Sequence, residues 1–100
     1  MEEIIEKIEN FVKKRRWKKY HTPKNLAISI AIESAELLEH FQWNEYNFEE
    51  IKKDEAKIKE IEEEIADIMI YSILFFSYLG TEIKGALIEK IRKNEEKYPA

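Results

Sequence analysis

The amino-acid sequence predicts an all-α protein, in which four helices form a bundle-like fold that is completed by association with further copies of the chain. Three observations carry this prediction. The 100 residues include only 2 Gly and 2 Pro, so little interrupts helical structure. Apolar residues recur every three or four positions, as they do on one face of a helix. Residues that start and stop helices stand between these apolar segments.

The composition is typical of one folded domain, and we expect residues 1–100 to form it. The chain is 44% apolar and 38% charged. It has no cysteine, which excludes disulfides and thiolate metal ligands and suits the reducing cytoplasm. The longest apolar segment, residues 65–79, contains polar residues and is shorter than the roughly 20 residues that cross a bilayer. We therefore expect a soluble, cytoplasmic protein without a membrane span.

The first predicted helix spans residues 2–19, and the second spans residues 23–41. The first has one apolar stripe at helical spacing, formed by Ile4, Ile5, Ile8, Phe11 and Val12. Before the second, Thr22 can cap a helix start and Pro23 suits the first helical position. Apolar residues cover most of the second helix, and its remaining stripe consists of Ser29, Glu33, Glu36 and His40.

The third predicted helix spans residues 48–79, with a break near Asp54 where the apolar pattern is weakest. Asn47 and Glu50 have the spacing of a capping box at its start. The second half of this helix is apolar nearly all round. Its exception is a polar stripe formed by Glu60, Glu64, Asp67 and Tyr71.

The fourth predicted helix spans residues 82–98, because Gly80 suits the end of the preceding helix and Thr81 can cap the next one. A helix that is apolar all round must be buried all round. The thin first and fourth helices cannot cover the apolar surfaces of the other two. We therefore expect a homo-oligomer, either a dimer or a dimer of dimers.

Basic and acidic residues are separated along the chain, although the net charge is only −4. Residues 10–32 contain no acid, and their basic residues are Lys13, Lys14, Arg15, Arg16, Lys18, Lys19 and Lys24. Acids dominate residues 33–67. This arrangement suggests a polyanion held beside a metal site. Nucleic-acid binding is the competing interpretation, but the overall acidity argues against it. A solvated helix face explains part of the basic run.

Two pairs of carboxylates interrupt the apolar helices. Glu33 and Glu36 share one helix face because they lie three residues apart, and so do Glu64 and Asp67. Buried carboxylates are costly unless they are paired or bind a cation. Mg²⁺ takes oxygen ligands and is the usual occupant where phosphate shares its coordination. Spacing alone leaves the alternative open that these acids line a solvated seam or pair with Lys and Arg.

Other chemistries fit these residues less well. Di-iron bundles use a Glu-x-x-His spacing. Here Glu36 is followed three residues later by Glu39, and His40 is one position too far. No Ser-His-Asp or Cys-His arrangement can be assembled from this sequence.

The ordered motifs resemble a known family. Glu33-Ser-Ala-Glu36, followed after 27 residues by Glu64-Ile-Ala-Asp67, looks like the paired E-x-x-E and E-x-x-D signature of the MazG-like all-α nucleoside triphosphate pyrophosphohydrolases. Residues 17–26, 37–43, 63–68 and 93–99 are similar to the small dCTP-pyrophosphatase branch of that superfamily. Either acid pair alone is a weak signal, but the ordered set covers nearly the whole chain.

The resemblance implies a MazG-type fold and hydrolysis of (deoxy)nucleoside triphosphates to the monophosphate and pyrophosphate, in the service of clearing the nucleotide pool. It implies Mg²⁺, with Mn²⁺ as a substitute, held by Glu33, Glu36, Glu64 and Asp67. Of these acids we favour Glu36 to orient the attacking water. The implied phosphate contacts are Tyr71, Lys90, Asn94 and Tyr98. The implied base contacts are Trp17, His21 and Trp43, with Lys24 and Asn25 as lesser candidates.

Plainer roles stay open for some of these residues. The tryptophans could be ordinary core residues, and His21 could serve the helix start near Thr22. Ile8 stands where we expect a His in dCTP-preferring relatives, which argues against a preference for cytosine. Two alternative functions remain: a non-catalytic helical bundle that binds partners, and the same chemistry on another nucleotide such as phosphoribosyl-ATP.

Overall fold

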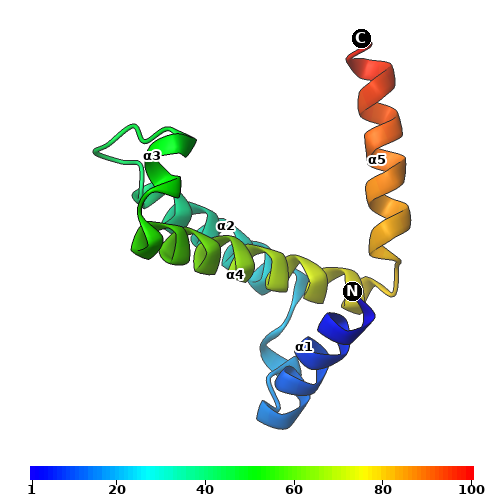
Figure 1. Ribbon diagram of the computed structural model, residues 1–100. Helices are drawn as coiled ribbons and strands as arrows, with labels where there is room; N and C mark the ends of the chain where they lie inside the picture. The colour runs from blue at the N-terminus through cyan, green and yellow to red at the C-terminus, as the bar shows by residue number, and fades with distance from the viewer.

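The computed structural model describes residues 1–100 and is all-α, with no strand (Figure 1). Its helices are α1 (Glu2–Arg15), α2 (Pro23–Glu39), α3 (Phe48–Lys52), α4 (Glu55–Leu79) and α5 (Ile83–Lys97), and a short 3₁₀ helix, η1 (Lys18–Tyr20), precedes α2. The predicted fold class is therefore confirmed, with five α-helices in place of the four expected.

Two predicted helices differ in their extent. The helix expected over residues 48–79 is divided into α3 and α4 at the suspected break. Asp54 is extended there (φ −118°, ψ 98°), and its side chain accepts a hydrogen bond of 3.1 Å from the backbone N–H of Lys57. α1 ends earlier than predicted because Arg16 adopts a left-handed conformation with φ 58°. The chain then turns through η1 to reach α2.

Two predicted helix starts are confirmed by their side-chain hydrogen bonds. The hydroxyl of Thr22 accepts a bond of 3.1 Å from the backbone N–H of Asn25 at the start of α2. At the start of α3, Asn47 accepts a bond of 2.9 Å from the backbone N–H of Glu50, and the Glu50 carboxylate accepts one from the backbone N–H of Asn47. Such local signals depend on neighbouring residues only, which is why the sequence reveals them.

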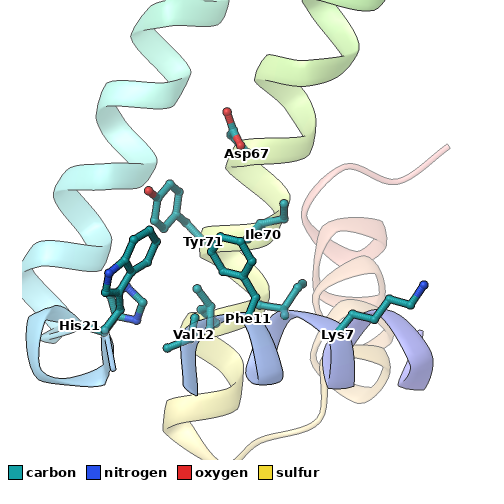
Figure 2. Close-up of a pocket in the computed structure, with 10 residues that line it drawn as sticks. Lys7, Phe11, Val12, His21, Asp67, Ile70 and Tyr71 are labelled. Carbon is teal, nitrogen blue, oxygen red and sulfur yellow. The ribbon is translucent and has the colours of Figure 1, made fainter. Parts of the chain in front are cut away.

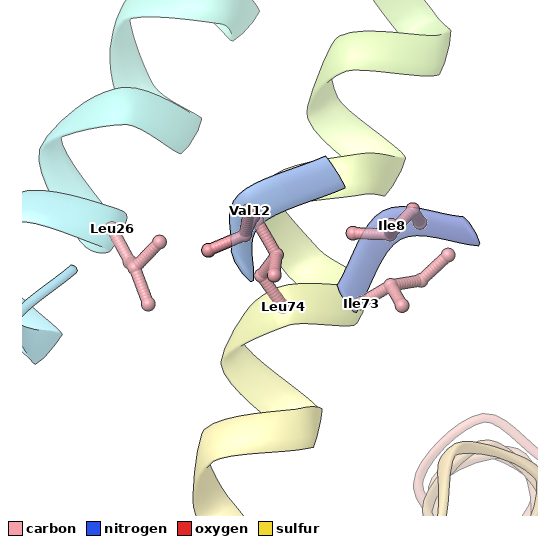
Figure 3. Packing of buried hydrophobic residues seen from close by; sticks show 5 residues of the cluster. All are labelled: Ile8, Val12, Leu26, Ile73 and Leu74. Atoms are coloured by element: carbon pink, nitrogen blue, oxygen red, sulfur yellow. The ribbon is translucent and has the colours of Figure 1, made fainter. Parts of the chain in front are cut away.

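α2 and α4 run antiparallel, and α1 packs across the C-terminal half of α4 (Figure 1). These three helices supply the whole core, which consists of Ile8, Val12, Leu26, Ile73 and Leu74 (Figure 3). The core lies at the end of the α2–α4 pair where α2 begins and α4 ends. The middle of the pair carries the predicted acids.

α5 projects away from the other helices (Figure 1). Gly80 ends α4 in a left-handed conformation (φ 71°), as predicted. The predicted cap at Thr81 is wrong, because Glu82 occupies the capping position of α5 and makes no side-chain capping bond. No residue of α5 is buried. The radius of gyration is 16.3 Å, whereas a compact chain of this length has about 13 Å, so the single chain is open.

No single helix combines the length and apolar composition needed to cross a membrane. α4 and α5 meet these criteria only when they are taken together, and they are bent by 104° relative to each other.

Candidate active site

The two predicted polar stripes face each other across the α2–α4 pair. One oxygen each from Glu33 on α2 and from Glu64 and Asp67 on α4 lies within 4.8 Å of the other two. Glu36 lies beside this three-residue cluster, close enough to Glu33 and Glu64 to raise the pKa of both carboxyl groups. The fold thus brings together four acids that lie up to 34 residues apart in the sequence (33 to 67).

Four ionised carboxylates are costly in this position. The pKa of Glu33 is raised from 4.5 to about 7, first by burial and then by the hydrogen bond with Glu36 and the charges of the other acids. The pKa of Glu64 is also raised, first by burial and then by its interaction with Glu36. The charge of His40 acts in the opposite direction and lowers the pKa of Glu64. Glu33 therefore retains its proton in part of the molecules near neutral pH, and a bound cation would displace that proton.

Two oxygens of the cluster lack any partner. Glu33 Oε2 and Glu64 Oε2 are buried and make no hydrogen bond. A buried polar atom that is left unpaired lowers stability. Carboxylate oxygens are the ligands that Mg²⁺ and Mn²⁺ prefer. The donor set therefore fits a hard divalent cation, which would satisfy both oxygens at once.

The acids do not use basic side chains as counter-charges. None of the four carboxylates forms an ion pair with Lys or Arg, and the one ionisable contact is between Glu64 and His40, at 3.9 Å. The alternative of a salt-bridged seam is therefore not seen.

A cavity of about 360 Å³ adjoins the acid cluster, with Asp67 at one end and side chains of α1 at the other (Figure 2). This volume lies within the usual range of small-molecule pockets, roughly 300–1,000 Å³. Three predicted substrate contacts, Trp17, His21 and Tyr71, meet in its wall. The remaining lining residues are Lys7, Ile8, Phe11, Val12, Ile70 and Leu74.

His21 is held in a fixed orientation. Its Nδ1 lies 2.9 Å from the hydroxyl of Tyr78 on α4. Burial lowers the pKa of His21, so the ring is neutral near pH 7. Its second nitrogen makes no hydrogen bond in the structure and can serve as a donor or acceptor for a polar ligand.

Most of the apolar cavity wall was not predicted from the sequence. Ile8, Phe11 and Val12 belong to the predicted apolar stripe, and Ile8 and Val12 are indeed core residues that also line the cavity. A stripe that only packs in a core and one that also forms a pocket wall have the same apolar pattern. The only sequence signal was Ile8, which stands where relatives are expected to have a His. Lys7 gave no signal, because a lysine beside an apolar stripe is common.

The single chain does not bring all predicted contacts to this cavity. Trp43 is 84% exposed in the connection between α2 and α3. The remaining predicted phosphate contacts, Lys90, Asn94 and Tyr98, belong to or directly follow α5, which projects away from the α2–α4 pair (Figure 1). Of the lesser candidates, Lys24 is exposed, and the Asn25 side chain donates a hydrogen bond of 2.9 Å to the carbonyl of Tyr20.

The sequence matches known proteins over nearly its whole length. The model of the MazG-like family matches residues 28–100, which include both acid pairs. The chain is 28% identical over 100 residues to dCTP pyrophosphatase 1 of Rattus norvegicus and 27% identical over 101 residues to that of Homo sapiens. These matches cover 99% and 100% of this chain but 59% of each relative, so the chain spans about three fifths of their length.

A solved structure is more similar. The crystal structure of a pyrophosphatase from Archaeoglobus fulgidus matches with a TM-score of 0.89 and 47% sequence identity. The match covers 100% of this chain and 93% of that one. The arrangement of the five helices is therefore that of a MazG-like pyrophosphatase.

Proposed function

Because the chain belongs to the MazG-like family, we propose that it hydrolyses (deoxy)nucleoside triphosphates to the monophosphate and pyrophosphate with Mg²⁺ or Mn²⁺. The observation that carries this proposal is the oxygen cluster of Glu33, Glu64 and Asp67, with two buried and unpartnered atoms, at the end of a cavity of ligand size. The pyrophosphatases among its relatives support the same reaction class.

The acids would hold the cation and guide water to the substrate. The bound cation would be held by Glu33, Glu36, Glu64 and Asp67 and would supply neutralisation of phosphate charge and activation of water. Glu36 lies beside both Glu33 and Glu64, which supports a role for it in orienting the attacking water and accepting its proton. Water then bonds to the α-phosphorus, the bond to the oxygen that bridges to the β-phosphorus breaks, and pyrophosphate leaves.

The cavity would hold the nucleoside. Its position beside Asp67 allows the phosphates to reach the acids while the base lies between Trp17 and the apolar wall. His21 supplies one neutral polar group for the base or the sugar. Few other polar groups line this wall, which suits contact with a base more than selection among bases.

A second copy of the chain would complete the site. Apolar residues on the open faces of α2, α4 and α5 are between two fifths and about two thirds exposed, among them Ile32, Leu38, Met69, Leu87 and Ile91. A homo-oligomer would cover them, with an interface above roughly 2,000 Å². In such an assembly, α5 could bring Lys90, Asn94 and Tyr98 to the acids of a neighbouring chain.

A panel of the common NTPs and dNTPs tests this proposal, with release of pyrophosphate as the measurement, in the presence of Mg²⁺ and after chelation. We expect metal-dependent release from at least one of them. If none of them is hydrolysed, the proposal is wrong, and pyrophosphate release from phosphoribosyl-ATP alone would favour the alternative substrate. The alternative of a non-catalytic bundle predicts in addition that Mg²⁺ leaves thermal stability unchanged, since only binding to the native state raises it.

A further inference from the structure

His40 lies between two acids of the facing helix. It directly follows α2, and only 16% of its side chain is exposed. Its Nδ1 is 3.8 Å from Oε2 of Glu60, and its Nε2 is 3.9 Å from Oε1 of Glu64. Both glutamates belong to the polar stripe of α4, and Glu64 is one of the candidate metal ligands.

The two polar stripes therefore continue beyond the acids assigned above. His40 is the last member of the α2 stripe, and it faces Glu60, the first member of the α4 stripe. Glu60 also lies 3.7 Å from Nζ of Lys57. A row of side chains from Lys57 through Glu60 and His40 thus ends on Glu64. The proposed reaction uses Glu64 and gives no role to His40 or Glu60.

The two oxygens of Glu64 have different surroundings. Oε1 is next to the imidazole of His40, whereas Oε2 is buried without a partner. The 3.9 Å separation is longer than a hydrogen bond, so the ring stands against the carboxylate without bonding to it in this structure.

We propose that His40 is a positioning residue for Glu64: its ring occupies the Oε1 side of the carboxylate and leaves Oε2 for the cation, while Glu60 fixes the ring from its other nitrogen. This inference rests on the metal site of the proposed function. Side chains that orient metal ligands commonly change metal affinity by about 10–100-fold when they are replaced. His40 is no member of the three-residue oxygen cluster itself.

The direction of the effect separates positioning from simple charge. A positively charged ring beside the site would repel a cation, so its removal would tighten cation binding. A ring that orients Glu64 has the opposite effect, and its removal weakens binding. The comparison needs a replacement of similar size, and His40→Leu provides it.

Binding of Mn²⁺ to the nucleotide-free, full-length protein tests the proposal, with free Mn²⁺ followed by electron paramagnetic resonance. We expect His40→Leu to raise the Mn²⁺ dissociation constant by about tenfold or more, and Glu60→Gln to raise it by a smaller factor. Glu62→Gln, which removes the same charge from an exposed position on α4, should leave it unchanged. The melting temperature without metal should be the same for all these variants. If His40→Leu does not fold, Glu60→Gln carries the test, because its side chain is 56% exposed.

Three results would overturn the inference: unchanged affinity in both His40→Leu and Glu60→Gln, tighter binding in His40→Leu, or a pulsed resonance signal from a nitrogen bonded directly to Mn²⁺ in the wild type. The failure of the proposed function looks different. Wild type that binds Mn²⁺ through a His40-dependent site but releases no pyrophosphate contradicts the reaction and leaves the role of His40 standing. Wild type that does not bind Mn²⁺ contradicts both.

Discussion

α4 and α5 follow each other in the sequence but have opposite relations to the rest of the chain. α4 lies against α2 and α1, contributes two of the five core residues and carries two of the three residues in the oxygen cluster, Glu64 and Asp67. α5 turns away after Gly80, has no buried residue and leaves Leu87, Ile88 and Ile91 more than half exposed. One chain can therefore assemble the acids by itself, whereas α5 does not reach them in the single chain.

The largest effect is expected at the acids between α2 and α4. Glu33→Gln, Glu36→Gln, Glu64→Gln and Asp67→Asn should each lower turnover by on the order of 10² or more. The fold should persist, because these changes reduce repulsion. Turnover is measured as pyrophosphate release and folding by circular dichroism. Glu63→Gln, an exposed neighbour on α4, should keep the wild-type rate. Near wild-type turnover in any two of the four variants would contradict the site.

A smaller effect is expected at Trp43, which, like the residues of α5, is not buried by the rest of its own chain. Stacking of an aromatic on a base contributes roughly 1–3 kcal/mol without choosing among bases. Trp43→Ala should therefore raise KM for all nucleotides by about tenfold and change kcat less. Phe48→Ala, which removes a similarly exposed aromatic side chain, is the matched control.

We also expect the enzyme to discriminate among the bases of its substrates by less than about 100-fold. Sharp selectivity for dCTP that disappears in Trp43→Ala would disprove this.

Mixing of inactive variants tests directly whether α5 acts on a neighbouring chain. Asp67→Asn and Lys90→Ala should each be weakly active alone. After joint refolding in equal amounts, about a quarter of the sites in a two-fold symmetric dimer would have both residues intact. Recovery of activity to that level would place α5 in the partner's site. Activity equal to the average of the two separate variants would place it in its own.

The smallest effect concerns stability and pH. The folded pKa of Glu33 is about 7, above the ordinary value of 4.5. Between these values the folded protein binds more protons than the unfolded chain, so the free energy of unfolding falls as pH rises. Denaturant titrations of the metal-free protein should show this loss, and it should be smaller in Glu33→Gln. Saturating Mg²⁺ should reduce it too. A metal-free protein that becomes more stable over this range would contradict the burial of Glu33.

The parts of this molecule that the sequence could predict are those specified by near neighbours. A few adjacent residues determine each of four features: the capping bonds at Thr22 and Asn47, the end of α4 at Gly80 and the break at Asp54. The acid cluster was also predictable, because acids at a spacing of three interrupt helices that are otherwise apolar. Their meeting then required only that the two helices pair.

The parts that escaped prediction depend on distant contacts or on single backbone angles. Arg16 ends α1 early by adopting a left-handed conformation. A glycine at this position would have predicted that conformation, but an arginine does not. The apolar residues of α1 that line the cavity have the pattern of a core helix, and Ile8 and Val12 belong to the core as well. That they also form a cavity wall follows only from the position of α1 across α4. The local sequence does not predict that α5 points away from the other helices. An apolar stripe has the same sequence pattern whether it packs against its own chain or against a second chain.

The core of five buried residues has a consequence for how folding depends on concentration. A chain that buries so little surface on its own gains much of its stability from whatever covers the rest, and the law of mass action then links folding to association. If copies of the chain provide that cover, dilution alone should lower the melting temperature, and the unfolding transition should shift with the logarithm of protein concentration. In that case the fraction of folded chains depends on protein concentration, because a chain folds stably only in association with other copies.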